Sequence, residues 1–328
     1  MSSQPSPVPG SYLVASAAAN SQRMAQRDVV RVRDLAHIEA LVHAEMLAGL
    51  AGGEAAGTGA GTGSGTGSGS GTGSGILQVP PLHQVQYEIS GMPISDIIEM
   101  VAALLTKITA TNDLQHDAMQ RNVAHQQQAN QNADPGPGGS QMSPLSHSVL
   151  AFHGKNVPAI TILSYLSRIH KYCPTTYEVF LSLLVYFDRM TERVNDLVMQ
   201  SEEARRRTGH GTEGSGSGSA RVTGTEHALI SPSATYFVVD SFNIHRLIIA
   251  GVTCASKFFS DVFYTNSRYA KVGGLPLGEL NHLEIQFLVL NDFRLAVPVE
   301  DLETYATMLV EFYAREVVAP RHRRSAAE

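Results

Sequence analysis

Apolar residues recur every three or four positions over most of the second half of the chain, which is the spacing of helices that bury one face. The strongest such stripe lies within residues 241–259. Four of its positions are small: Ala250, Gly251, Cys254 and Ala255. Because small side chains let neighbouring helices approach closely, this stripe predicts a central helix, with Gly251 and Ala255 as structural positions.

Four further apolar stripes predict helices around that centre, at about 160–172, 176–190, 279–292 and 298–312. No segment alternates convincingly between apolar and polar residues, so no strand is predicted. The pattern therefore predicts an all-α fold, with one five-helix domain over about 146–316.

Two weaker stripes precede this domain. The first follows Pro93 and Asp96, residue types that suit the first turn of a helix, and it predicts an accessory helix at 93–113 that packs on the domain from outside. The second predicts a helix at 28–50. A tract of Gly, Ser and Thr at 57–75 follows it, so we expect that helix to be loosely tethered.

Composition divides the rest of the chain. Segments rich in Gly, Ser, Thr, Gln and Asn bury too little apolar surface to offset the loss of chain entropy. We therefore expect long disordered tails and inserts. They are a mostly disordered region at 1–92, a linker at 114–145, a flexible insert at 200–235 and a basic tail at 317–328.

Charge and cysteine content narrow the class of protein. Lys and Arg number 24 against 30 Asp and Glu, a net charge of −6, which argues against a nucleic-acid partner. Two cysteines exclude a disulfide framework. There is no secretory signal and no apolar run long enough to span a bilayer, so we expect no membrane association and an intracellular protein of the nucleus, the cytoplasm or both.

Catalytic chemistry has little support in the sequence. The thirteen histidines are scattered, without Cys, Asp or Glu at metal-ligand spacing. The segment 272–276 holds two adjacent glycines but no Gly-Lys-Ser/Thr, so it predicts a turn rather than a phosphate-binding loop. We expect no catalytic residue, no metal and no cofactor.

Two charged residues stand at the edges of apolar helices. Lys257 lies near the end of the central helix, and Glu284 lies between Leu283 and Ile285. One interpretation is structural: the lysine complements the helix dipole, and the glutamate is a boundary carboxylate paired within the chain. The other is a surface that binds a second protein. Spacing alone leaves both open.

Several strings in this region resemble the cyclin box, in the form found in P/U-type cyclins, which are related to the fungal phosphate-signalling cyclins. The resemblance covers about 146–313. Its first half is carried by Phe152-His153, Tyr165-Leu166-Ser167-Arg168-Ile169, Tyr172-Cys173-Pro174-Thr175-Thr176 and Tyr186-Phe187-Asp188-Arg189. Its more specific second half is carried by Asn243-Ile244-His245-Arg246, Ala255-Ser256-Lys257, Tyr264-Thr265-Asn266, Tyr269-Ala270-Lys271-Val272-Gly273-Gly274 and Leu283-Glu284.

The resemblance implies a non-catalytic regulatory subunit that binds and activates a cyclin-dependent Ser/Thr kinase, with that kinase's substrates as further candidate partners. Lys257 and Glu284 match the family residues that hold the kinase's mobile helix through charge-assisted hydrogen bonds. Phe258 and Leu288 would add apolar contact around them.

This chain departs from the cell-cycle cyclins at two places. Asp188 matches a structural aspartate of the family, but Ala159 stands where its arginine partner is expected. The stretch 158–162 does not match the substrate-docking patch. The alternative function is a cyclin-fold adaptor in transcription or scaffolding without a kinase. A single box and net acidity weigh against that alternative.

Overall fold

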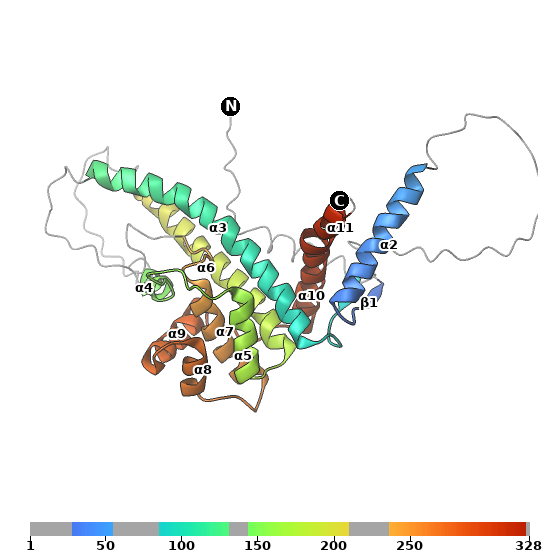
Figure 1. Cartoon of the computed structure of the whole chain (residues 1–328). Coiled ribbons are helices and arrows are strands. Elements are labelled where there is room, and N and C mark those ends of the chain that lie inside the picture. The colour runs from blue at the N-terminus through green and yellow to red at the C-terminus, as the bar shows by residue number, and fades with distance from the viewer. Residues whose placement is uncertain (1–27, 55–84, 131–143, 210–235, 326–328) are drawn as a thin grey trace, which may run out of the picture.

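The computed structural model of the chain describes residues 28–54, 85–130, 144–209 and 236–325 (Figure 1). Helices dominate these residues, and the predicted all-α class is confirmed. The helices in chain order are α2 (Leu35–Glu54), α3 (Ile94–Asn130), α4 (Pro144–Ala151), α5 (Ile162–Tyr172), α6 (Tyr177–Gly209), α7 (Ile244–Phe259), α8 (Asn266–Gly273), α9 (Leu277–Leu290), α10 (Val299–Tyr313), the π-helical turn η4 (Ala314–Val318) and α11 (Ala319–Ser325).

Helix α7 forms the centre of the domain, as its apolar stripe predicts. Every residue from Leu247 to Ser256 is buried. The helix packs against α6 and α9 and also contacts α5 and α8. A Cβ atom added to Gly251 would lie only 2.5 Å from Cδ2 of Leu183 and 3.0 Å from Cζ of Phe287. Helices α6 and α9 therefore approach α7 as closely as they do because position 251 has no side chain.

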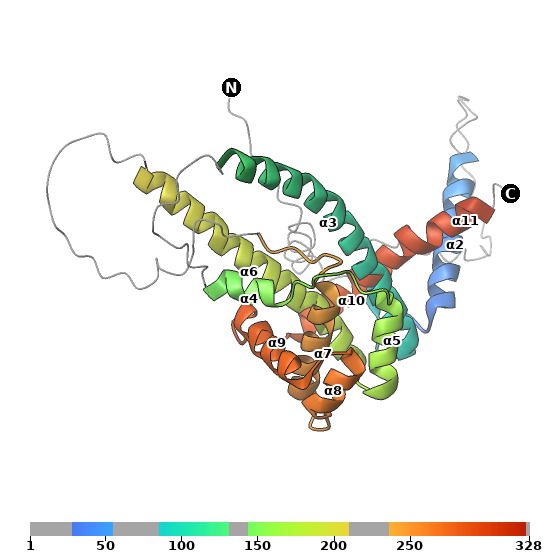
Figure 2. The same cartoon turned by 60° about the vertical axis from the view of Figure 1, so that its left-hand side comes forward.

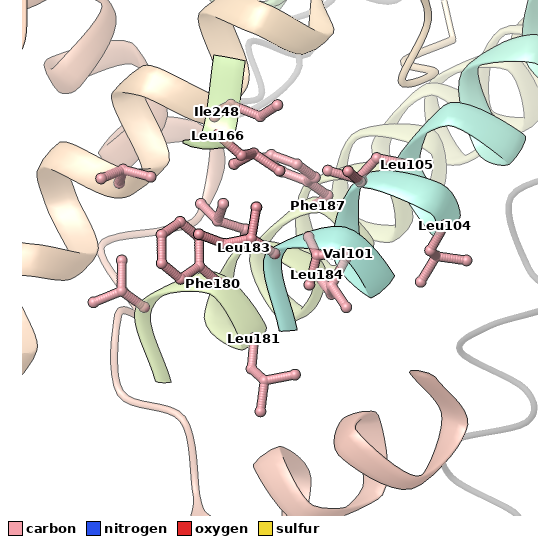
Figure 3. Close-up of a cluster of buried hydrophobic side chains, with 14 of the residues drawn as sticks. Val101, Leu104, Leu105, Leu166, Phe180, Leu181, Leu183, Leu184, Phe187 and Ile248 are labelled. Atoms are coloured by element: carbon pink, nitrogen blue, oxygen red, sulfur yellow. The ribbon is translucent and has the colours of Figure 1, made fainter. Parts of the chain in front are cut away.

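Helix α3 crosses α5, α6 and α10 (Figures 1 and 2). Figure 3 shows Val101 and Leu105 of α3 beside Leu184 and Phe187 of α6, all within one continuous hydrophobic core. The predicted accessory helix at 93–113 is therefore a core element. It also continues to Asn130, which corrects the linker expected at 114–145 for residues 114–130, while residues 131–143 lie outside the described residues. Neither Gly nor Pro occurs between 114 and 134, so nothing in the polar sequence ends the helix earlier.

The N-terminal region contains more structure than we expected from its composition. Strand β1 (Val29–Arg31) pairs in parallel with β2 (Gln86–Glu88), with Val29 opposite Gln86. Helix α2 packs on η4 through buried side chains that include Ile38 and Val42. The expectation of a loosely tethered helix in a mostly disordered region is thus wrong for residues 28–48 and 85–92, while the Gly/Ser/Thr tract at 57–75 lies outside the described residues. Three-residue strands are too short to produce a visible alternation.

The structure also differs from two other expected boundaries. Helix α6 continues to Gly209, so the first ten residues of the expected insert at 200–235 are helical, and 210–235 lie outside the described residues. Residues 317–325 of the expected basic tail at 317–328 instead contribute to η4 and α11, with Val318 buried, and residues 326–328 lie outside the described residues. Pro320 is the second residue of α11, directly after the π-helical turn η4, and because proline has no backbone N–H it cannot donate the hydrogen bond of a regular α-helix at this point.

Candidate functional site

Lys257 and Glu284 meet at the surface of the domain. Nζ of Lys257 lies 2.5 Å from Oε1 of Glu284, with 31% of the lysine side chain and 16% of the glutamate side chain exposed. The structure therefore brings together two residues that are 27 positions apart in the sequence. This contact also agrees with the structural interpretation of Glu284 as a boundary carboxylate, because the glutamate is paired within the chain.

Helix α8, which the sequence did not predict, supplies a third partner for this ion pair. Nδ2 of Asn266, the first residue of α8, donates to Oε2 of Glu284 at 2.7 Å and to Oδ1 of Asn281 at 2.8 Å. Both oxygens of Glu284 are thus engaged, and the carboxylate is held in one orientation. Helix α8 ends at Gly273 and is capped by Gly274, whose φ of 73° is the left-handed conformation expected of a glycine in the predicted turn.

Apolar side chains border the ion pair on both helices. Phe258 is 50% exposed beside Lys257, and Ile285 is 56% exposed beside Glu284. We call Lys257, Phe258, Glu284 and Ile285 the ion-pair surface. Leu288, expected as a further contact, is only partly exposed and packs on the core. The sequence analysis did not propose Ile285 as a contact residue. Its position outside the apolar stripe of its own helix is the signal that could have identified it as an exposed apolar side chain.

Asp188 has a partner that its motif does not reveal. The hydroxyl of Tyr305, on α10, donates to Oδ2 of Asp188 at 2.6 Å. A tyrosine 117 residues away therefore contacts the aspartate that has no arginine at position 159. Burial raises the pKa of Asp188 to about 7, and the hydrogen bond from Tyr305 offsets this only in part.

The raised pKa of Asp188 predicts a pH-dependent stability. The folded chain holds this proton up to about pH 7, whereas the unfolded chain releases it near pH 4, so stability falls as pH rises through this window. Asp188→Asn keeps an acceptor for Tyr305 and removes the titration. We expect the variant to be more stable than the wild type at pH 8, by on the order of 2 kcal/mol, and similar at pH 4. Urea unfolding at both pH values measures the difference.

Asp261→Asn serves as the control for this experiment, because Asp261 is exposed and its replacement removes the same charge. We expect it to change the free energy of unfolding by a few tenths of a kcal/mol at most. A loss of stability for Asp188→Asn at pH 8 would contradict the assignment of a half-buried Asp188 that is protonated in the folded chain.

The described residues offer few groups for chemistry. Among them, no group of three or more His, Cys, Asp or Glu is placed to hold a metal ion. Both cysteines, Cys173 and Cys254, are buried and free, and burial raises the pKa of each thiol. Buried thiols of raised pKa are poor nucleophiles. Within the described part of the chain, no helix is long and apolar enough to cross a bilayer.

The sequence of this chain matches a known protein family. A family model described as Cyclin matches residues 95–213 and 227–295. The match includes α3 and thus begins before the region in which the sequence motifs were found. It ends before α10.

Named relatives show the same similarity. The chain is 43% identical over 225 residues to PHO85 cyclin-7 of Saccharomyces cerevisiae, a match that covers 69% of this chain and 64% of that protein. It is 40% identical over 228 residues to PHO85 cyclin-like protein psl1 of Schizosaccharomyces pombe, covering 69% and 71%. It is 31% identical over 215 residues to Cyclin-U4-1 of Arabidopsis thaliana, covering 66% and 75%. The match to PHO85 cyclin-7 thus spans less than two thirds of that protein's length.

Proposed function

Since the chain belongs to the cyclin family, whose members are non-catalytic regulatory subunits, we propose that it binds and activates a cyclin-dependent Ser/Thr protein kinase. The observation that carries the proposal is the ion-pair surface. It places a hydrogen-bonded lysine and glutamate between two exposed apolar side chains. In protein interfaces, the contacts around a few strong interactions exclude water from them, and the two apolar side chains are placed to do this for the ion pair.

The ion pair is suited to binding because it is already ordered. Lys257 has three N–H groups, of which the contact with Glu284 uses one, and about a third of its side chain remains exposed. Asn266 holds the glutamate in place. A partner would therefore meet side chains that lose little further rotamer freedom on binding.

Activation needs no chemical group from this chain. In protein kinases, a glutamate on a mobile helix must pair with the lysine that positions ATP. We propose that the ion-pair surface grips that helix and favours its inward position. Such a partner changes the populations of two kinase conformations and takes no part in phosphoryl transfer.

The names of the relatives suggest which kinase to test first. Two of them are named as a PHO85 cyclin and a PHO85 cyclin-like protein. We propose that the partner of this chain is a PHO85-type kinase.

Co-purification with such a kinase tests the proposal. We expect the full chain to retain the kinase and to raise its rate of peptide phosphorylation at least tenfold. Lys257→Ala combined with Glu284→Ala should reduce both by at least tenfold, because both charged contacts are lost. Circular dichroism should show unchanged helicity.

A matched control is available in a second exposed ion pair. Nζ of Lys107 lies 3.4 Å from Oε2 of Glu316, between α3 and η4. Replacing these two residues by alanine also removes one positive and one negative charge, and we expect it to leave kinase binding within twofold of the wild type. Full kinase binding by the Lys257/Glu284 double variant would exclude the proposed interface.

A further inference from the structure

The opposite end of α7 carries a second candidate site. A pocket of about 510 Å³ lies between the segment that precedes α5, the first turn of α7 and the end of α8. Helices α5, α7 and α8 contact one another (Figure 2). Arg246 and Lys257 are eleven residues apart on α7, so the pocket lies roughly 16 Å along the helix axis from the ion-pair surface. The two sites are therefore separate.

The pocket is basic in an acidic protein. Its lining residues include three cations, Lys155, Arg168 and Arg246, and no carboxylate. Arg246 forms an ion pair at 2.5 Å with Glu279, which lies outside the lining. Two of the three positive charges thus remain without a carboxylate partner in the described structure, in a chain whose net charge is −6. A basic pocket of this kind attracts an anionic group.

Buried polar atoms at the pocket lack partners. Nε of Arg168 is buried without a hydrogen bond, and so is Nδ1 of His245. The other ring nitrogen of His245, Nε2, donates to the carbonyl oxygen of Ile160 at 2.9 Å, which leaves Nδ1 as a hydrogen-bond acceptor. Buried polar groups usually have a hydrogen-bond partner, either protein or water, so these two atoms are available to a ligand that enters the pocket. The ligand that completes them offers an anion to Arg168 and an N–H or O–H to His245.

Hydrogen bonds between distant segments hold the walls of the pocket in place. The backbone N–H of Gly154 donates to the carbonyl oxygen of Phe242 at 2.9 Å. The hydroxyl of Tyr165 donates to the carbonyl oxygen of Gly273 at 3.3 Å. The ring of His153 stacks on Phe242, with 5.2 Å between centroids. The pocket is thus built before any ligand arrives, which lowers the entropic cost of binding.

We propose that this pocket binds a phosphorylated serine or threonine side chain of a peptide. The two uncompensated positive charges match the charge of about −1.5 to −2 on a phosphoryl group at neutral pH. The pocket is much larger than one phosphoryl group, and Pro158, Phe242 and Leu275 provide apolar walls for neighbouring residues of a peptide. Backbone N–H groups of the peptide supply the donor that Nδ1 of His245 lacks.

An immobilised peptide library tests this proposal. Its members carry a fixed central phosphoserine between random flanking residues, and a second library carries serine instead. We expect the first library to retain at least ten times more of the full chain than the second. Lys155→Ala combined with Arg168→Gln should remove this preference. Lys155→Ala alone should weaken it several-fold without risk to the fold, because Lys155 is exposed.

Lys171→Ala is the matched control. Lys171 lies on α5, as Arg168 does, and its replacement removes a positive charge, but it does not line the pocket. We expect it to retain the preference within twofold. Equal retention by the two libraries would overturn the proposal. So would a preference unaffected by the pocket variants, inorganic phosphate that binds as tightly as the best phosphopeptide, or duplex DNA that binds more tightly. The proposal does not depend on kinase binding, which the pocket variants should leave unchanged.

Discussion

Gly251→Val is expected to lower the free energy of unfolding by about 3 kcal/mol or more. A Cβ atom alone would stand 2.5 Å from Cδ2 of Leu183 and 3.0 Å from Cζ of Phe287, and valine adds two methyl groups beyond it. Leu183 and Phe287 are fully buried, so neither side chain has free space into which it can move. Overpacking of a close-packed core typically costs 1–3 kcal/mol, occasionally more, and here it separates α7 from both α6 and α9.

Urea unfolding followed by circular dichroism measures this effect. Gly278→Val is the control, because Gly278 also lies in a helix, α9, and a Cβ atom there meets no atom within 4 Å. We expect its free energy of unfolding to stay within about 0.5 kcal/mol of that of the wild type. Equal midpoints for the two variants would show that the close approach at position 251 is not required.

Exchanging the two charges of the ion-pair surface is expected to abolish kinase binding without unfolding the domain. Lys257→Glu with Glu284→Lys retains an ion pair between α7 and α9, and the side-chain oxygen of Asn266 can then accept from the new lysine. A partner that recognises the original order of charges meets like charges in both places. We expect at least a hundredfold loss of affinity, or about 2.7 kcal/mol.

The exchange separates the two interpretations of this ion pair. If the pair serves only to join the two helices, the exchanged variant binds the kinase as well as the wild type does. If it serves to bind the kinase, the exchanged variant binds more weakly than the double alanine variant, while its unfolding midpoint stays near that of the wild type. Titration of the kinase against both variants, with unfolding curves for each, decides between these results.

Local sequence patterns predicted some elements well and others poorly. Helix α7 was predicted accurately because its apolar residues follow the helical period over four turns. Strands β1 and β2 were missed because three residues carry almost no periodic signal, and each is stabilised by a partner far away in the chain. The helical end of α3 was missed for another reason: its polar composition suggested a linker, although the same residues form helices readily.

By itself, the sequence determined the fold class, the central helix, the absence of a catalytic pattern and the identity of Lys257 and Glu284 as candidate binding residues. These follow from periodicity, composition and short motifs, all of which are local. Only the tertiary structure decided that Lys257 contacts Glu284, that Tyr305 contacts Asp188 and that three cations line one pocket. Each of these depends on how helices distant in the chain pack together, and packing follows from the shapes of whole helix surfaces, which no local pattern records.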